Sequence, residues 1–220
     1  MRGAGQNGAG GPQSPAVPVP TTTMTELPPP VEREPIHTRR VTTHGYLRAD
    51  GLWDIEGELV DTKTYAFDNN DGRHRDPGQP IHHMKIRLTL DDRLVVQAAV
   101  AAMAETPFPE CPAAEVPLPG LVGATCGPGW RKAVEQAMGG IRGCTHVREL
   151  LYAMATVAFQ TVMPYRNMRG RAQGVTATAM TKPGPQMGQC LAWDFDGPMI
   201  ARNFPQFAGW RKPEATPEKA

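Results

Sequence analysis

The sequence has little that would direct the chain to a membrane, to nucleic acid or to an oxidising compartment. Its 220 residues carry 23 Lys and Arg against 22 Asp and Glu, which gives a formal net charge of +1. Without an excess of positive charge, nucleic-acid binding is not expected. No apolar run approaches the roughly 18 residues of a membrane span, and the N-terminus has no hydrophobic signal region. We therefore expect a cytoplasmic protein with neither a membrane nor a nucleic-acid partner.

Cysteine is also sparse, and its spacing excludes the usual thiol frameworks. The four cysteines are Cys111, Cys126, Cys144 and Cys190. In a chain without an export signal such thiols are expected to be reduced. They lack the paired CxxC spacing of a zinc ribbon. If these cysteines bind a metal, the fold must bring distant segments together.

Glycine and proline, 23 of each, are concentrated towards the two ends of the chain. Residues 1–35 have too few large apolar side chains to offset the entropy of ordering, so they are predicted to be a disordered tail. Met24 is an alternative native start within it. A single α+β domain is predicted over residues 38–207, followed by a disordered tail over residues 211–220.

Alternating side chains after Thr38 predict β-strands. Asp50-Gly51 is a strong hairpin signal between two such stretches. The acidic residues of this hairpin are expected to face solvent; they are Asp50, Asp54, Glu56, Glu58 and Asp61.

A third strand is predicted over residues 81–90, because apolar and polar residues alternate there. Its apolar face begins with His82, whereas His83 lies on the other face and is expected to be solvated. A turn at Asp91-Asp92 leads to a fourth strand over residues 93–106, whose alanine content is also compatible with a helix. The result is an antiparallel β-meander.

Two or three helices are expected to cover one face of this sheet. Residues 106–120 contain too many prolines for regular structure. One helix is predicted near residues 128–139, and a second from Cys144 to Pro164 with an apolar stripe. The remaining residues are expected to be mostly irregular, with the apolar patch 190–195 docking onto the core.

Residues that suit metal binding lie on three of these segments. The helix start at Cys144 would stabilise a thiolate, because the first backbone N–H groups have no partner within the helix. His146 follows one turn in, His82 opens the apolar strand face, and Cys111 follows the fourth strand. Zinc, iron or an iron–sulfur cluster would suit the predicted ligands His82, Cys111, Cys144 and His146, with Cys190 as an additional candidate.

Two other interpretations stay open. Cys144 could be an enzyme nucleophile with His146 as its base. Alternatively, both residues could be structural parts of a noncatalytic module that binds a ligand or a protein, since a buried cysteine behaves as a small hydrophobe. Nothing in the sequence names a substrate or a partner.

The motifs Asp-Gly-Leu-Trp-Asp, from Asp50, and Gly-Cys-Thr-His, from Gly143, resemble a bacterial family classed only as a domain of unknown function. The resemblance extends from about Thr38 to Phe207 and implies a cytoplasmic bacterial protein. In this family Gly-Cys-His-Ala is expected near the end, where this chain has Gln189-Cys190-Leu191-Ala192. The order of His82, Cys111 and the Cys144–His146 pair is also similar in layout to iron–sulfur scaffold proteins of the NifU type.

Overall fold

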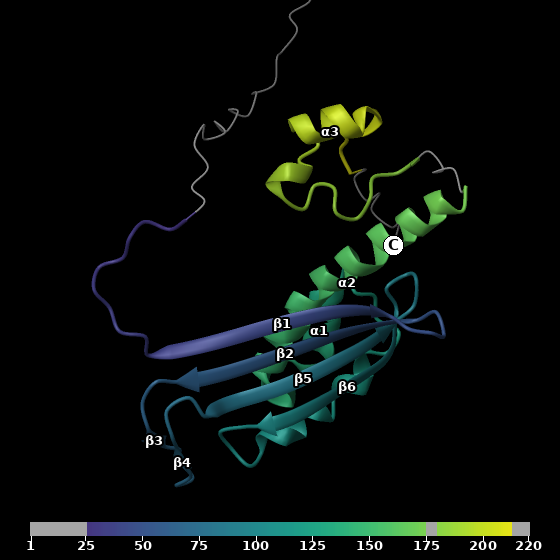
Figure 1. Cartoon of the computed structure of the whole chain (residues 1–220). Helices are drawn as coiled ribbons and strands as arrows, with labels where there is room; N and C mark the ends of the chain where they lie inside the picture. The colour runs from purple at the N-terminus through teal and green to yellow at the C-terminus, as the bar shows by residue number, and fades with distance from the viewer. Residues whose placement is uncertain (1–25, 175–179, 213–220) are drawn as a thin grey trace, which may run out of the picture. The chain divides into compact units, whose positions relative to one another are not determined.

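The computed structural model describes residues 26–174 and 180–212, and its main feature is a four-stranded antiparallel sheet (Figure 1). The strand order β1-β2-β5-β6 confirms the predicted meander. A two-stranded hairpin lies in the polar loop between β2 and β5. The strands are β1 (His37–Leu47), β2 (Trp53–Lys63), β3 (Phe67–Asp68), β4 (His74–Arg75), β5 (Pro80–Leu90) and β6 (Val96–Glu105).

The turns predicted from Asp and Gly join the long strands. Gly51 adopts a φ of 88°, which glycine reaches without a steric penalty. Between β5 and β6, the Asp91 carboxylate accepts hydrogen bonds from the backbone N–H groups of Arg93 and Val95, at 2.8 and 2.9 Å. The alanine-rich segment after this turn is strand β6, which pairs with β5 along its length.

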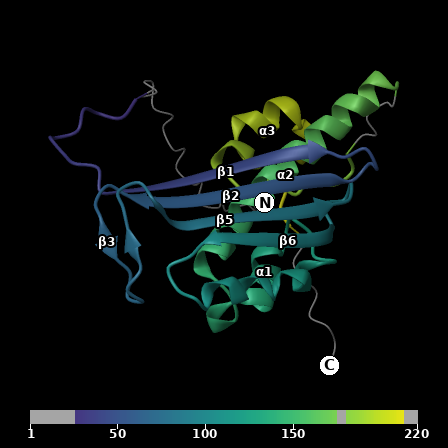
Figure 2. The same cartoon turned by 60° about the horizontal axis from the view of Figure 1, so that its bottom comes forward.

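Helices α1 (Trp130–Met138) and α2 (Thr145–Ala172) pack on one face of the sheet (Figure 2). The buried stripe of α2 meets the apolar side chains of β2 and β5, which face it at alternate positions. This arrangement confirms the α+β class. The stripe consists of Val147, Leu150, Leu151, Met154, Ala158 and Val162.

Helix α2 does not end at Pro164, as the sequence had suggested, but continues to Ala172. Proline has no backbone N–H, so the carbonyl of Gln160 loses its partner in the helix. Both residues are exposed, and water can hydrate this carbonyl. The proline-rich segment also has regular structure, since it forms two short 3₁₀ helices, η1 (Cys111–Glu115) and η2 (Leu118–Leu121).

The C-terminal segment differs from its predicted irregular structure. It contains the short helix α3 (Pro198–Asn203) and its own apolar cluster around Met187, Ile200 and Phe207. Trp193 packs in this cluster and not, as predicted, against the core of the sheet. Several aromatic residues close in sequence make a local cluster sufficient to bury them.

The predicted tails fall largely on residues 1–25 and 213–220, which lie outside the described residues. Residues 26–34 belong to a separate N-terminal unit. Among the helices of the described segments, none is both long enough and apolar enough to cross a membrane.

The close approach of β1 to α2 generates a first prediction. A Cβ atom at Gly45 would overlap the side chain of Thr161 on α2. We expect Gly45→Ala to lower the free energy of unfolding by about 1–3 kcal/mol, the usual cost of overpacking, as measured by chemical denaturation. Gly120→Ala is the matched control, because its Cβ would lie 3.6 Å from Ala137, an ordinary contact. Equal effects of the two substitutions would contradict the close packing of β1 on α2.

Candidate metal site

The candidate site is built around Asp61, a buried carboxylate near the end of β2. Its side chain is only 1% exposed. The prediction that Asp61 faces solvent, as one of the acidic residues of the hairpin, is wrong. Odd-numbered residues of β2, such as Ile55 and Leu59, face the helices, and Asp61 continues that series.

Strand β1 supplies the positive partner of Asp61. Arg39 lies directly opposite Asp61 in the strand register. Its Nε and Nη2 atoms donate to the two carboxylate oxygens, each at 2.8 Å, which is a bidentate pair. His37 Nε2 donates to Oδ1 at 3.2 Å. The Asp61 carboxylate is therefore held in one orientation.

Strand β5 brings His82 to the other side of the same carboxylate. His82 pairs with Asp61 in the strand register, next to an irregularity between Asp61 and Thr62. Its Nδ1 donates to Oδ2 of Asp61 at 3.0 Å. The His82 side chain is only 16% exposed.

The start of helix α2 completes the site. Cys144 is the N-cap residue and His146 lies in the first turn. His146 Nε2 is 3.8 Å from Oδ2 of Asp61, and its ring centroid is 3.9 Å from that of His82. The Cys144 Sγ atom is 3.6 Å from His146 Nδ1. Glu149 lies one turn later on α2. Its carboxylate forms an ion pair with Arg39 of β1 at 2.7 Å, which connects α2 to β1.

The protonation states of this cluster follow from burial and hydrogen bonding. Burial raises the pKa of Asp61, but the hydrogen bonds and charge of Arg39, together with His37 and His82, outweigh burial and lower the pKa to about 2. Burial also lowers the pKa of His82, and the nearby His146 adds to this effect. Asp61 is thus ionised near neutral pH, and the neutral imidazole of His82 is favoured.

The Cys144 thiol is subject to two opposing effects. Burial raises its pKa, but hydrogen bonds from His146 and from the backbone N–H groups of Val147 and His146 outweigh burial, so the pKa is lowered. Cys126, in contrast, is buried in the core, and burial raises its pKa to about 12. Cys144 therefore has thiolate character that Cys126 lacks.

Three of the four predicted ligands lie together. Among the described residues, the one group of three ligand atoms within 4.8 Å of one another comes from Asp61, His82 and His146. Cys144 is next to His146, whereas Cys111 begins η1 and takes no part in this group. Cys190 is exposed, and His83 is half-buried and pairs with Glu58 on the other face of the sheet, at 2.7 Å.

Sequence reasoning missed Asp61, Arg39 and His37. Counting in twos from Trp53 along β2 places Asp61 on the helix face, so strand periodicity was an available signal for it. Nothing local distinguishes Arg39 from Arg40, because only the pairing of β1 with β2 selects the residue opposite Asp61.

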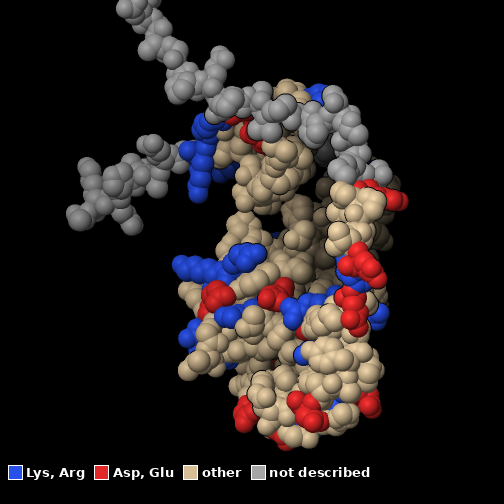
Figure 3. Space-filling model, turned by 90° about the vertical axis from the view of Figure 1, so that its left-hand side faces the viewer, with Lys and Arg blue, Asp and Glu red and all other residues tan. Residues whose placement is uncertain are grey.

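The charge around this end of the sheet is mixed. Figure 3 faces the end where β1 begins, and it shows basic and acidic side chains next to one another. Exposed ion pairs such as Arg39–Glu149 contribute to this pattern. On the side that Figure 3 shows, the described residues form a mixed pattern in place of an extended field of one sign.

Comparison with known proteins identifies a family for this chain but no activity. A family model described as "Protein of unknown function (DUF2889)" matches residues 37–160, more than half of the 220-residue chain. The chain belongs to this family. The match contains all the residues of the candidate site and ends before the C-terminal segment. No curated protein and no solved structure matches the chain.

The Arg39–Asp61 pair generates the second prediction. Arg39→Gln leaves a buried carboxylate without its cation, so we expect the free energy of unfolding to fall by roughly 3 kcal/mol, measured by urea denaturation. Arg40→Gln is the matched control, since Arg40 is the next residue, lies on the opposite face and is exposed. If both variants lose the same stability, the pair with Asp61 does not carry this energy.

Proposed function

We propose that this protein binds a divalent transition metal, zinc or iron(II), through Asp61, His82 and His146. The observation that carries the proposal is the convergence of their ligand atoms to within 4.8 Å of one another. Two imidazoles and one carboxylate are a donor set that both metals accept. With respect to the ligands predicted from sequence, Asp61 takes the place of Cys111.

The separations fit a metal with small adjustments. A metal at about 2.0–2.2 Å from each ligand places the ligand atoms roughly 3.0–3.5 Å apart. His82 Nδ1 is 3.0 Å and His146 Nε2 is 3.8 Å from Oδ2 of Asp61. A metal would replace the hydrogen bond between His82 and Asp61, and the neutral His82 ring would then carry its proton on Nε2 instead of Nδ1.

The groups behind the ligands support the same function. Arg39 and His37 hydrogen-bond to the oxygens of Asp61 and fix its orientation, as outer partners of metal ligands do. Cys144 is placed to add a thiolate or to hold the ring of His146. Since iron–sulfur clusters are held by several thiolates, a site with one nearby cysteine favours a single metal ion.

The metal proposal predicts a defined loss in matched variants. We expect the wild-type chain to bind one equivalent of zinc or iron(II) in anaerobic titrations. His82→Ala and His146→Ala should each weaken binding by at least about 100-fold, because each removes a direct ligand. His83→Ala is the control, since it changes the adjacent residue on the opposite face and should bind as the wild type does.

The Cys111 and Cys144 variants identify the remaining ligand. Cys111→Ser should keep full metal affinity, and Cys144→Ser should lose affinity if the thiolate is bound. Metal content that is unchanged in the His82→Ala variant, in protein that unfolds at the wild-type temperature, would contradict the proposal.

One observation favours a second candidate function, a thiol-dependent enzyme. Cys144 Sγ, the His146 ring and Asp61 form a continuous relay with separations of 3.6 and 3.8 Å. In such a relay the imidazole takes the thiol proton and the carboxylate orients the imidazole. The separation of two residues along the chain thus lets the Cys144 sulfur and the His146 ring meet at the start of α2.

Alkylation separates this candidate from the first. In metal-free protein at pH 7, Cys144 should react with iodoacetamide at least about 10-fold faster than the exposed Cys190, because hydrogen bonds lower the pKa of the Cys144 thiol. His146→Gln should remove that advantage, as measured by peptide mapping. Faster reaction at Cys190 in the wild type would count against a nucleophilic Cys144. Failure of both this test and the metal test would favour the noncatalytic binding module.

A further inference from the structure

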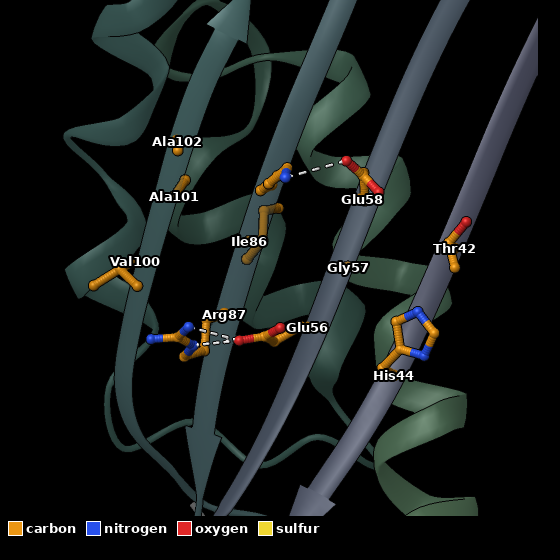
Figure 4. Close-up of a pocket in the computed structure, with 11 residues that line it drawn as sticks. Thr42, His44, Glu56, Gly57, Glu58, Ile86, Arg87, Val100, Ala101 and Ala102 are labelled. Atoms are coloured by element: carbon orange, nitrogen blue, oxygen red, sulfur yellow. Dashed lines mark hydrogen bonds and ion pairs between the residues drawn. The ribbon is translucent and has the colours of Figure 1, made fainter.

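The sheet has a second face, which α1 and α2 do not cover. A hollow of about 430 Å³ lies on it and crosses all four long strands. Figure 4 shows the lining side chains in front of the strands, with the helices behind them. They are Thr42 and His44 of β1, Glu56 and Glu58 of β2, Lys85 and Arg87 of β5, and Val100 and Ala102 of β6.

These side chains form a regular grid. The strand register aligns one row as His44, Glu56, Arg87 and Val100. A second row is aligned by the same register as Thr42, Glu58, Lys85 and Ala102. Read along the strands, β2 carries an acidic column, β5 a basic column and β6 a column of small apolar residues.

We propose that this face binds the same face of a second copy of the chain, which gives a two-fold symmetric dimer. A two-fold axis parallel to the strands, midway between β2 and β5, places the β2 of one copy over the β5 of the other. It also places β1 over β6. A self-complementary patch of this kind is what a two-fold interface requires.

Charge complementarity selects this occupant. Within one chain, Glu56 pairs with Arg87 at 2.6 Å and Glu58 with Lys85 at 3.4 Å. Under the two-fold axis, each carboxylate also faces the basic residue of the other copy. Each row of the dimer then contains four charges, two from each copy, at the corners of a square. Every charge therefore has two neighbours of the opposite sign.

The outer columns are complementary as well. Val100 of β6 is 55% exposed, and the axis brings it over the His44 row of β1. Tyr46, which is 48% exposed, lies next to His44 on the same face of β1. Apolar and aromatic side chains at both edges would exclude water from the charged centre, as the rim of a stable interface does.

The face is large enough for a stable dimer. Four strands spaced about 4.8 Å apart, three of 11 residues and one of 10, cover roughly 700 Å² per copy. Stable interfaces bury about 800 Å² per partner. Side chains that project from the strands add surface to the flat area of the sheet and bring the total close to this value. Two twisted sheets can pack face to face with their strands nearly aligned.

Charge exchange tests this interface in the full chain. Analytical ultracentrifugation of the wild type should give a dimer, twice the chain mass of 23.9 kDa. A basic variant, Glu56→Lys with Glu58→Lys, and an acidic variant, Lys85→Glu with Arg87→Glu, should each be monomers. An equimolar mixture should form the mixed dimer, because unlike columns again face each other. A wild type that stays monomeric at about 100 µM, roughly one hundred times a micromolar dissociation constant, would overturn the proposal.

A second pair of variants covers the case in which the charge-exchanged chains do not fold. Val100→Arg adds a charge to the β6 column without breaking an ion pair and should give a monomer with the wild-type unfolding temperature. Val122→Arg is the matched control, because Val122 is similarly exposed, at 51%, and lies outside the sheet. A dimer that survives Val100→Arg would also overturn the proposal.

Discussion

The candidate site depends on one ion pair, between the buried Asp61 of β2 and the partly exposed Arg39 of β1. A carboxylate that is 1% exposed is costly unless its oxygens are satisfied, and Arg39 contacts both of them. The rest of the site follows from this pair. Because Arg39 fixes the plane of the carboxylate, Oδ2 is presented to His82 and His146 at defined distances.

Arg39 also links β1 to α2, which hydrophobic packing holds together only weakly. β1 is an edge strand, and most of its side chains are exposed, so it contributes little to the core. Its attachment to α2 depends on the approach of Gly45 to Thr161 at one end and on the Arg39–Glu149 pair at the other. The polar cluster therefore positions the start of α2, where Cys144 and His146 lie.

Much of the fold could be predicted because its signals are local. The turns at Gly51 and Asp91, the alternation of β5 and the apolar stripe of α2 each depend on a few consecutive residues. The continuation of α2 through Pro164 could not be predicted, because it depends on the exposure of this side of the helix to water. The C-terminal cluster similarly depends on which of two apolar surfaces Trp193 contacts.

The candidate site was only half accessible from sequence, for a related reason. His82 and His146 stand out because a polar residue opens an apolar strand face or a helix. Asp61 resembles its solvated neighbours Glu56 and Glu58 until the period of two is counted from the buried Trp53. The identity of its partner, Arg39, requires the pairing of two strands, which no local pattern specifies.

Strand alternation also separates the candidate site from the open face of the sheet. On β2, Asp61 faces the helices, whereas Glu56 and Glu58 face away from them. On β5, His82 belongs to the candidate site, and Lys85 and Arg87 belong to the opposite face. A slip of one residue in the register would exchange the two sets. The buried pair of Arg39 with Asp61 disfavours such a slip, because it would leave a carboxylate among apolar side chains or an arginine without its partner. The Arg39–Asp61 ion pair thus favours the one strand register that gives both the geometry of the candidate site and the pattern of charges on the open face.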